Sequence, residues 1–548
     1  MAKNSALPMV NEQALIAEPK FELQVRDPRA LSVALGRFLD ITATVTGRAT
    51  AYNSKAEQEA AEIEAHNKLF IYDRTLYGAL LTLPGVTDRA KQMGLLRLLK
   101  DRTNGNSFRL SEDTVTSIED KVLGTLVEDV TVPRMMKAFV MLRDEKINNA
   151  RTRRVALRAL LKNKGLEIRV VRYREKFGDV LRHIFGHKKA SVLRAILERP
   201  RVSWERHETK FVKEQLGRYA RFTDDTTLQV CVAYALGSDS MFVQTNESTK
   251  LIKAVFEARR DLKLGKDLPL EVLEGIRSQY HKSVKRAEVL EMASKSKAGM
   301  TDTQRMQVQA SAQKAGVTNI DFDATKQDAV KLYIYAFERG LTEDIIRALD
   351  EKAALAAAML PTKVDKVGIL VDDSESNTGD ETQKLRPMAV ALATRDVLAK
   401  TGEEAVIKYT SGKEQGRLVR PSGDSSLAEG LVEVLLGEPD VVYVISDGYE
   451  NAPAGRFAET VMRVRDLGIT TPIIQISPVA AAEVKDAGLR QLTDEVKTVP
   501  VSNPTAMASS MLRTLVEVDP VKAVSVLMKI AFEKKALGNI AEVKKLEG

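Results

Sequence analysis

The feature that most constrains the fold is a change of sequence pattern at Pro361. After this residue, short β-rich runs alternate with helical segments. The expected strands are VGILV (367–371), AVIKYT (405–410), VVYVIS (441–446) and TPIIQIS (471–477), with helices near 383–400, 426–436 and 456–467. Such alternation predicts parallel βαβ units and a doubly wound, Rossmann-like α/β domain. Sheets of this kind bind ligands beyond the carboxyl ends of their strands.

The sequence before Pro361 is helical almost throughout. Segments such as RALSVALGRFLD and RTRRVALRALLKN place apolar and charged residues at helical spacing, and polar breaks separate them. Their lengths suit an all-α, HEAT-like solenoid or ring, and we find no fixed repeat period. We therefore expect a multidomain chain. Its parts are an N-terminal extension (1–24), a HEAT-like helical domain (25–360), an α/β domain (361–518) and a C-terminal helical segment (519–548).

The two halves carry opposite charge. Residues 361–548 hold 23 basic and 28 acidic side chains, a net charge of −5, whereas residues 1–360 have a net charge of +13. This asymmetry predicts different partners for the two halves. No apolar run of about 18 residues is present and the N-terminus has no apolar signal-peptide core, so we expect no membrane association. The single Cys231 lies in an apolar run and fits a reducing cytoplasm.

Oxygen-bearing side chains follow the expected strands. The stretch ILVDDSESNTGD ends the first strand and supplies Asp372, Ser374 and Ser376, PSGDSSLAEGL supplies Ser425, and YVISDGYEN supplies Asp447. Carboxylate and hydroxyl oxygens without thiol or imidazole favour Mg²⁺ or Mn²⁺ over zinc. Two carboxylates leave a divalent ion under-coordinated, so water or a partner's carboxylate would complete its shell.

These residues resemble a von Willebrand factor A (VWA) domain with its metal-ion-dependent adhesion site. That family has D-x-S-x-S after its first strand, a Thr in a second loop, for which Ser425 would stand, and an Asp in a third. Glu375 and Asn377 depart from the family's usual Gly and Met around the second serine. Three alternatives stay open: a solvated acidic loop, a phosphotransfer site around Asp372, and a VWA-like site whose ion is only structural or is absent.

Residues 131–221 form the most basic part of the chain, with 25 Lys and Arg against 9 Asp and Glu. The spacing of Arg151, Arg154, Arg158 and Lys162 predicts four cations on one helix face. Such a face would attract a polyanion and bind it with strong salt dependence. More candidates follow in VVRYREKFGDVLRHIFGHKKA, namely Arg172, Arg174, Arg182, His187, Lys188 and Lys189, with Tyr173 and Phe185 between them as core residues or base-stacking groups. The alternative is a basic face that is merely solvated.

The stretch RYREKFGDVLRHIFGHKKA resembles part of the Ro-type RNA-binding module, the TROVE domain. The plausible matches are Arg172, Tyr173, Asp179, Leu181, Arg182, His187 and Lys188 or Lys189; the family's Gly-Trp-Ser-His segment is missing and two residues are inserted. The order of a helical ring and then a VWA domain is also the family's. The resemblance implies that the ring binds small structured noncoding (Y-like) RNA and single-stranded RNA ends.

We therefore predict a non-enzymatic, cytoplasmic RNA-binding protein with a Mg²⁺ site and no DNA specificity. No phosphate-binding P-loop, nucleophile elbow or zinc-protease motif occurs in the sequence. One alternative is a metal-dependent protein-interaction module that binds a partner's acidic side chain. Another is a structural component of a larger assembly.

Overall fold

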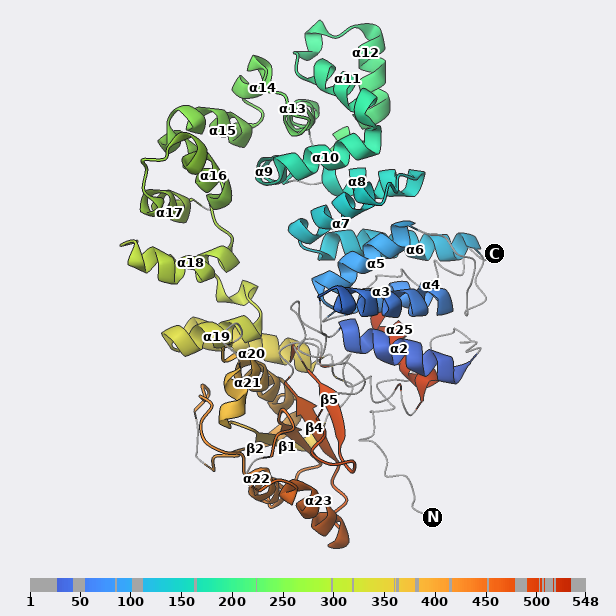
Figure 1. The fold of residues 1–548 in the computed structure, drawn as a ribbon, viewed down its shortest axis with the longest axis vertical. Coiled ribbons are helices and arrows are strands. Elements are labelled where there is room, and N and C mark those ends of the chain that lie inside the picture. The colour runs from blue at the N-terminus through green and yellow to red at the C-terminus, as the bar shows by residue number, and fades with distance from the viewer. Residues whose placement is uncertain are drawn as a thin grey trace. The chain divides into compact units, whose positions relative to one another are not determined.

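The computed structural model describes most of the chain (Figure 1). The described residues are 27–42, 55–83, 86–100, 112–161, 165–222, 224–296, 299–317, 320–358, 360, 364–379, 384–412, 416–450, 453–478, 490–501, 503–504, 507, 516 and 519–533. Lys162 and the predicted N-terminal extension (1–24) lie outside them, as does the end of the C-terminal segment. None of the described helices is long and apolar enough to cross a membrane.

The contacts divide the chain into two compact units. Unit 1 comprises residues 1–97, 102–126 and 327–548, and unit 2 comprises residues 98–101 and 127–326. The C-terminal helix α25 (Pro520–Glu533) belongs to unit 1, where it packs against the N-terminal helices α4 (Arg74–Leu81) and α2 (Pro28–Thr42). This division differs from the predicted boundary at 360/361, and the four predicted segments stay a prediction.

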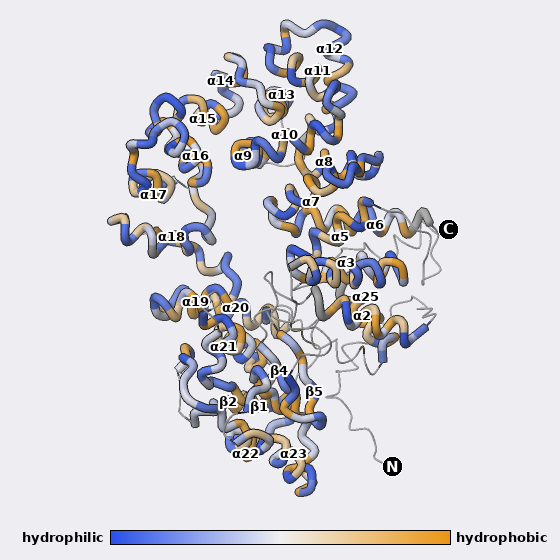
Figure 2. The backbone as a smooth tube through the Cα atoms, viewed as in Figure 1, coloured by the Kyte–Doolittle hydropathy of each residue, from blue (hydrophilic) through white to orange (hydrophobic). Residues whose placement is uncertain are grey.

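Unit 2 is entirely helical in its described part, as the sequence pattern predicts. Its α-helices are α7 (Val132–Asp144), α8 (Ala150–Leu161), α9 (Leu166–Arg172), α10 (Arg174–Phe185), α11 (His187–Leu197), α12 (Arg206–Leu216), α13 (Asp225–Ala235), α14 (Met241–Thr245), α15 (Lys250–Arg260), α16 (Leu270–Tyr280), α17 (Arg286–Lys295) and α18 (Asp302–Lys314). Short 3₁₀ turns are η1 (Arg201–Ser203), η2 (Gly217–Phe222), η3 (Leu262–Gly265) and η4 (Ala324–Lys326). Hydrophilic and hydrophobic residues alternate along these helices (Figure 2), which is the pattern of helices that bury one face.

The core of unit 2 lies between successive helices. Helix α10 packs against α7, α11 and α13, and α9 packs against α13 and α15. Gly178 of α10 lies so close to α13 that a Cβ atom there would be 2.2 Å from the carbonyl oxygen of Ala235. Each helix buries its apolar stripe against its neighbours, as in a HEAT-like array.

Unit 1 combines helices with a five-stranded parallel sheet. Its helices outside the α/β domain are α2 (Pro28–Thr42), α3 (Lys55–Tyr72), α4 (Arg74–Leu81), most of α5 (Asp88–Lys100) and α6 (Glu112–Asp129), α19 (Ala329–Arg339), α20 (Glu343–Ala357) and α25 (Pro520–Glu533). The α/β domain contains β1 (Val364–Val371), η5 (Glu375–Thr378), α21 (Arg386–Ala399), β2 (Gly402–Tyr409), α22 (Leu427–Leu435), β3 (Val441–Ile445), α23 (Arg456–Asp466), β4 (Ile473–Ser477) and β5 (Lys497–Pro500).

The sheet has the strand order β2-β1-β3-β4-β5, and every neighbouring pair is parallel. Leu370, Val442 and Val444 face α22 and α23 on one side. Helix α21 packs on β1 from the other side and is itself covered by α19 and α20, so it is buried around most of its circumference. The predicted doubly wound α/β domain is thus confirmed. The chain places β2 on one side of β1 and then β3, β4 and β5 on the other side, so the strand order reverses between β1 and β3.

Candidate nucleic-acid interface and candidate metal centre

The predicted oxygen donors meet at the carboxyl ends of β1 and β3. These strands are neighbours in register, with Val371 opposite Ile445, so the residues that follow each strand emerge side by side. The Ser446 hydroxyl donates a hydrogen bond of 2.8 Å to Asp372 Oδ2, and the backbone N–H of Ser374 donates to Asp372 Oδ1 at 3.1 Å. The Oγ atoms of Ser374 and Ser376 are 3.0 Å apart. The sheet topology therefore assembles this candidate metal centre.

Ser425 and Asp447 are held by the third loop. Ser425 is fully buried, and its hydroxyl donates to the carbonyl oxygen of Tyr449 at 3.2 Å. The N–H of Tyr449 in turn donates to Asp447 Oδ1 at 3.0 Å. The backbone N–H of Glu375 donates to the carbonyl of Gly423, which fixes the first loop to the second. Hydrogen bonds thus connect all three loops that carry the predicted donors.

Burial shapes the electrostatics of the centre. Asp372 is fully buried, and loss of hydration raises the pKa of its carboxyl to about 6. The nearby Asp447 carboxylate also contributes to this raised pKa, and the hydrogen bonds from Ser374 and Ser446 oppose it. Ser376 is exposed and Asp447 is half-buried, so the centre opens to solvent on that side.

The donor set fits a hard divalent cation better than a soft one. All five predicted ligands offer oxygen, and an ion beside Asp372 would stabilise the charged form of a carboxylate that burial disfavours. Among the residues that the structure describes, no group of three or more His, Cys, Asp or Glu side chains could hold a metal. Any ion here would therefore depend on the hydroxyls as much as on the two carboxylates.

Asp373 is a residue of this centre that the motif does not single out. It is fully buried, and its Oδ1 accepts hydrogen bonds of 2.9 Å from the Thr410 hydroxyl and from the backbone N–H of Ser411. Its carbonyl accepts from the N–H of Ser422 at 2.8 Å. Asp373 therefore ties the first loop to the end of β2 and to the loop that carries Ser425. In the sequence, only the position of Thr410 at the end of an expected strand points to these hydrogen bonds of Asp373.

The predicted basic stripe is only partly exposed. Arg154 and Arg158 are exposed on α8, but Arg151 is only 5% exposed. Its Nη1 donates to the carbonyl of Leu98 at 3.4 Å, so the guanidinium lies against the end of α5. The prediction that Arg151 shares an exposed face with the other cations is therefore wrong.

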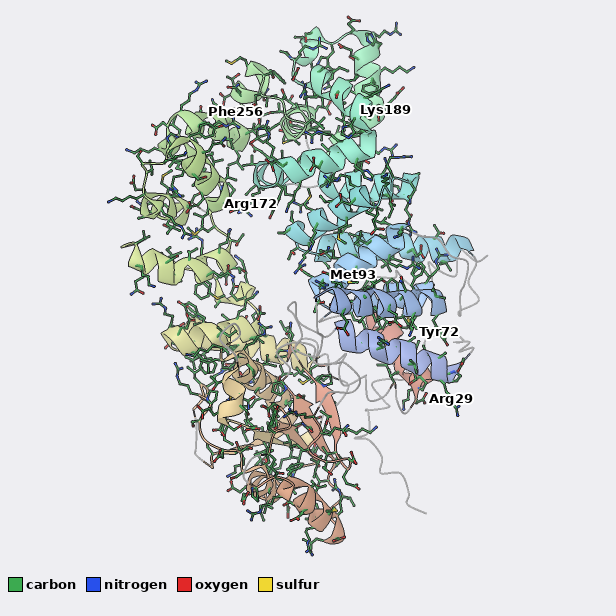
Figure 3. The ribbon with its side chains drawn as sticks, viewed as in Figure 1. Arg29, Tyr72, Met93, Arg172, Lys189 and Phe256 are labelled. Atoms are coloured by element: carbon green, nitrogen blue, oxygen red, sulfur yellow. The ribbon has the colours of Figure 1, made fainter. Side chains whose placement is uncertain are left out.

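Three of the following cations are held by neighbouring carboxylates. Arg172 is 3.1 Å from Glu271, and Arg182 donates to Asp179 at 3.0 Å. Arg174 donates to Asp239 at 2.8 Å and stacks on the Tyr234 ring. Figure 3 labels Arg172, at the end of α9. These pairs hold the three guanidinium groups against other residues of unit 2.

The remaining predicted cations are on the surface. His187, Lys188 and Lys189 form the exposed first turn of α11, where Figure 3 labels Lys189. Over residues 150–220, the described exposed Lys and Arg side chains number twelve and the exposed acidic ones three. The basic set is Arg153, Arg154, Arg158, Lys176, Lys188, Lys189, Arg194, Arg201, Arg206, Lys210, Lys213 and Arg218, and the acidic set is Glu175, Glu205 and Glu214. We call this the α8–η2 basic surface.

Comparison with known proteins finds a likeness in structure but not in sequence. No family model matches the chain, and no curated protein matches it. Among solved structures, the crystal structure of the Deinococcus radiodurans Ro (RSR) protein is similar over 81% of this chain and 99% of that chain, at 12% identity and a TM-score of 0.28. The matched protein is a Ro protein. Ro is also the family that the sequence motifs resemble.

Proposed function

We propose that the chain is an RNA-binding protein of the Ro type that holds small structured noncoding RNA on the α8–η2 basic surface of unit 2. The proposal assigns no catalytic step to any residue. Its RNA contacts are Arg154, Arg158, His187, Lys188 and Lys189, the predicted cations that remain exposed in the described part of the chain.

The excess of exposed cations over residues 150–220 carries this proposal. Twelve exposed Lys and Arg side chains against three exposed acidic ones leave an excess of positive charge on one run of helices, with Arg201 paired to Asp225 of α13. Like charges repel when they crowd together, so such a surface is stabilised when a polyanion lies along it. Phosphates would displace counterions there, which supplies affinity with a steep dependence on salt.

Charge reversal with a matched control tests the proposal. In the full chain, Arg158, Lys188 and Lys189 are changed together to Glu. The control changes Lys263, Lys266 and Lys282, which are equally exposed lysines of unit 2 outside the basic surface. We expect the first variant to lose most of its affinity for a structured RNA, with a salt slope lower by up to about 3, because each lost phosphate contact removes about 1. Equal losses in both variants would contradict the mapping.

We further propose that the centre at the ends of β1 and β3 holds Mg²⁺ or Mn²⁺. Asp372, Ser374, Ser376, Ser425 and Asp447 would provide its protein ligands. The burial of Asp372 beside a second carboxylate supports this, because a cation would compensate both charges. When bound, the ion supplies a positive charge with a free coordination position that an acidic group of a partner could occupy.

This second site suggests a candidate function besides RNA binding, the metal-dependent capture of a protein partner. Asp372→Ala would remove a ligand at the floor of the centre and abolish Mg²⁺-dependent binding of such a partner. RNA affinity should remain, since the α8–η2 basic surface belongs to unit 2. Loss of RNA binding in this variant at unchanged stability would contradict the separation of the two functions.

A further inference from the structure

Strand β2 forms one edge of the sheet, and in the described part of the chain only β1 pairs with it (Figure 1). The backbone N–H of Thr410, directly after β2, donates to the carbonyl of Val371 at 3.1 Å, so Thr410 faces β1. Because the backbone groups of successive strand residues point to opposite sides, those of Ala405 and Ile407 face away from β1. Among the described residues, no hydrogen bond reaches these outward groups. An edge of this kind is a template for another strand.

The two edges of the sheet are not equally suited to such pairing. Strand β5 has only four residues and ends with Pro500, which has no N–H group to donate. Strand β2 has eight residues, of which 403–405 are exposed and 406–408 are half-buried. A cavity of about 550 Å³ adjoins residues 407–409, so there is open space beside the second half of this strand. The β2 edge is therefore the one that another strand can reach.

The sequence of β2 is complementary to itself when two copies run antiparallel. Outward backbone groups must meet outward backbone groups, so Ala405 and Ile407 can pair only with odd-numbered residues of the other copy. Among the registers that this rule leaves, the one with its two-fold axis at Val406 places Glu404 opposite Lys408 of the second copy, and does so twice. In the same register, Ala405 lies opposite Ile407 on the other face of the sheet, which gives two apolar pairs.

The two charged side chains are available for this pairing. Glu404 is 3.6 Å from Lys366 and Lys408 is 3.4 Å from Glu433, which are long ion pairs within one chain. The Glu404 side chain is 73% exposed and the Lys408 side chain is 44% exposed. Both lie on the same face of the strand because they are four residues apart. Opposite charges that face each other across antiparallel strands stabilise the pair, and like charges destabilise it.

We propose that the chain associates with a second copy of itself through β2, with the two strands antiparallel about a two-fold axis at Val406. The two five-stranded sheets then continue into each other across this edge. The occupant of the edge is a second copy because the charge pattern of β2 matches its own reverse. This inference is independent of the proposed RNA binding, which uses unit 2.

Cysteine substitution in the full chain, purified free of nucleic acid, tests the register. The protein has a single cysteine, Cys231, which is buried. In Val406→Cys, the two new thiols would face each other at a Cα separation of about 4.5 Å, which suits a disulfide. In the control Ala405→Cys, the two thiols would be offset by about 7 Å along the strand, which is too far. We expect mild oxidation to cross-link the first variant and not the second.

Charge reversal tests the pairing itself. Sedimentation velocity at increasing protein concentration should show a dimer of the wild type. Glu404→Lys and Lys408→Glu should each weaken self-association by at least about tenfold, because two attractive pairs become two repulsive ones. An equimolar mixture of the two variants should recover the dimer, since every basic side chain then faces an acidic one.

Three results would overturn the proposal. The first is a wild type that stays monomeric at every concentration, together with no cross-link in Val406→Cys. The second is a dimer that both charge reversals leave unchanged, because another surface would then hold it. The third is cross-linking of Ala405→Cys in place of Val406→Cys, which would contradict the register that brings the opposite charges together.

Discussion

Replacing Asp372 with Asn should stabilise the metal-free protein. Burial raises the pKa of this carboxyl from 3.8 to about 6, so above pH 6 the folded chain holds a buried charge that the unfolded chain would hydrate. That rise corresponds to about 3 kcal/mol of unfolding free energy, at about 1.4 kcal/mol per pH unit. Asn keeps the shape of the side chain and removes the charge, and the Ser446 hydroxyl can accept from its amide where it now donates.

The sign of the pH dependence follows from linkage. Because the folded pKa is the higher one, the folded state binds the extra proton between pH 3.8 and about 6. The contribution of Asp372 to stability is present below pH 3.8 and is lost as the pH rises through 6. In EDTA, the unfolding free energy of Asp372→Asn should therefore exceed that of the wild type only slightly at pH 4 and by about 3 kcal/mol at pH 8. Mg²⁺ at 100 times its Kd should add about 2.7 kcal/mol to the wild type alone, which nearly cancels the higher stability of the variant at pH 8.

The assay must report on unit 1. The single Trp204 belongs to unit 2, so its fluorescence does not follow the sheet. Amide hydrogen exchange of peptides from β1 and β3, read by mass spectrometry, measures the opening of the sheet directly. Asp365→Asn, an exposed carboxylate on β1, is the matched control and should change nothing. Two results would refute the reasoning. One is that Asp372→Asn is less stable than the wild type in EDTA at pH 8, and the other is that Mg²⁺ stabilises the variant as much as it stabilises the wild type.

Four substitutions test the packing. Gly178→Ala should destabilise unit 2 by about 2 kcal/mol because the added Cβ would meet the carbonyl oxygen of Ala235. Gly275→Ala in α16 has open space around the added Cβ and should stabilise unit 2 by up to about 1 kcal/mol. Urea unfolding followed by Trp fluorescence measures both changes. Arg174→Met should lower the urea midpoint of unit 2 and leave the salt slope of RNA binding unchanged, because the guanidinium is bound within the unit. Asp396→Asn should cost unit 1 about 3 kcal/mol in hydrogen exchange of α21, since it leaves a buried arginine without its carboxylate.

The sequence predicts the sheet well because local pattern decides it. Strand β3 is a continuous apolar run, β1 has one over 367–371, and β4 is interrupted only by Gln475 before its final Ser477, as buried parallel strands require. The helices α22 and α23 have amphipathic spacing. Strand β5 was not predicted, because Lys497–Pro500 is only four residues long, begins with a charge and ends with proline. The candidate metal ligands were predictable for the same reason, since the ends of neighbouring parallel strands meet at one edge.

The basic surface shows where local pattern fails. Helical spacing places Arg151 beside Arg154 and Arg158, but it does not say that the first turn of α8 lies against Leu98 of another helix. The pairing of Arg172 with Glu271 likewise depends on residues about a hundred positions apart in the chain.

The most direct test of the account is a lysine footprint of the full chain bound to a structured RNA. Surface lysines are acetylated with and without RNA, and the modified peptides are quantified by mass spectrometry. The account predicts that RNA protects Lys188 and Lys189 and leaves Lys263, Lys266 and Lys282 as reactive as in the free protein, although all five are exposed lysines of unit 2. RNA that binds while Lys188 and Lys189 stay fully reactive would contradict the central claim.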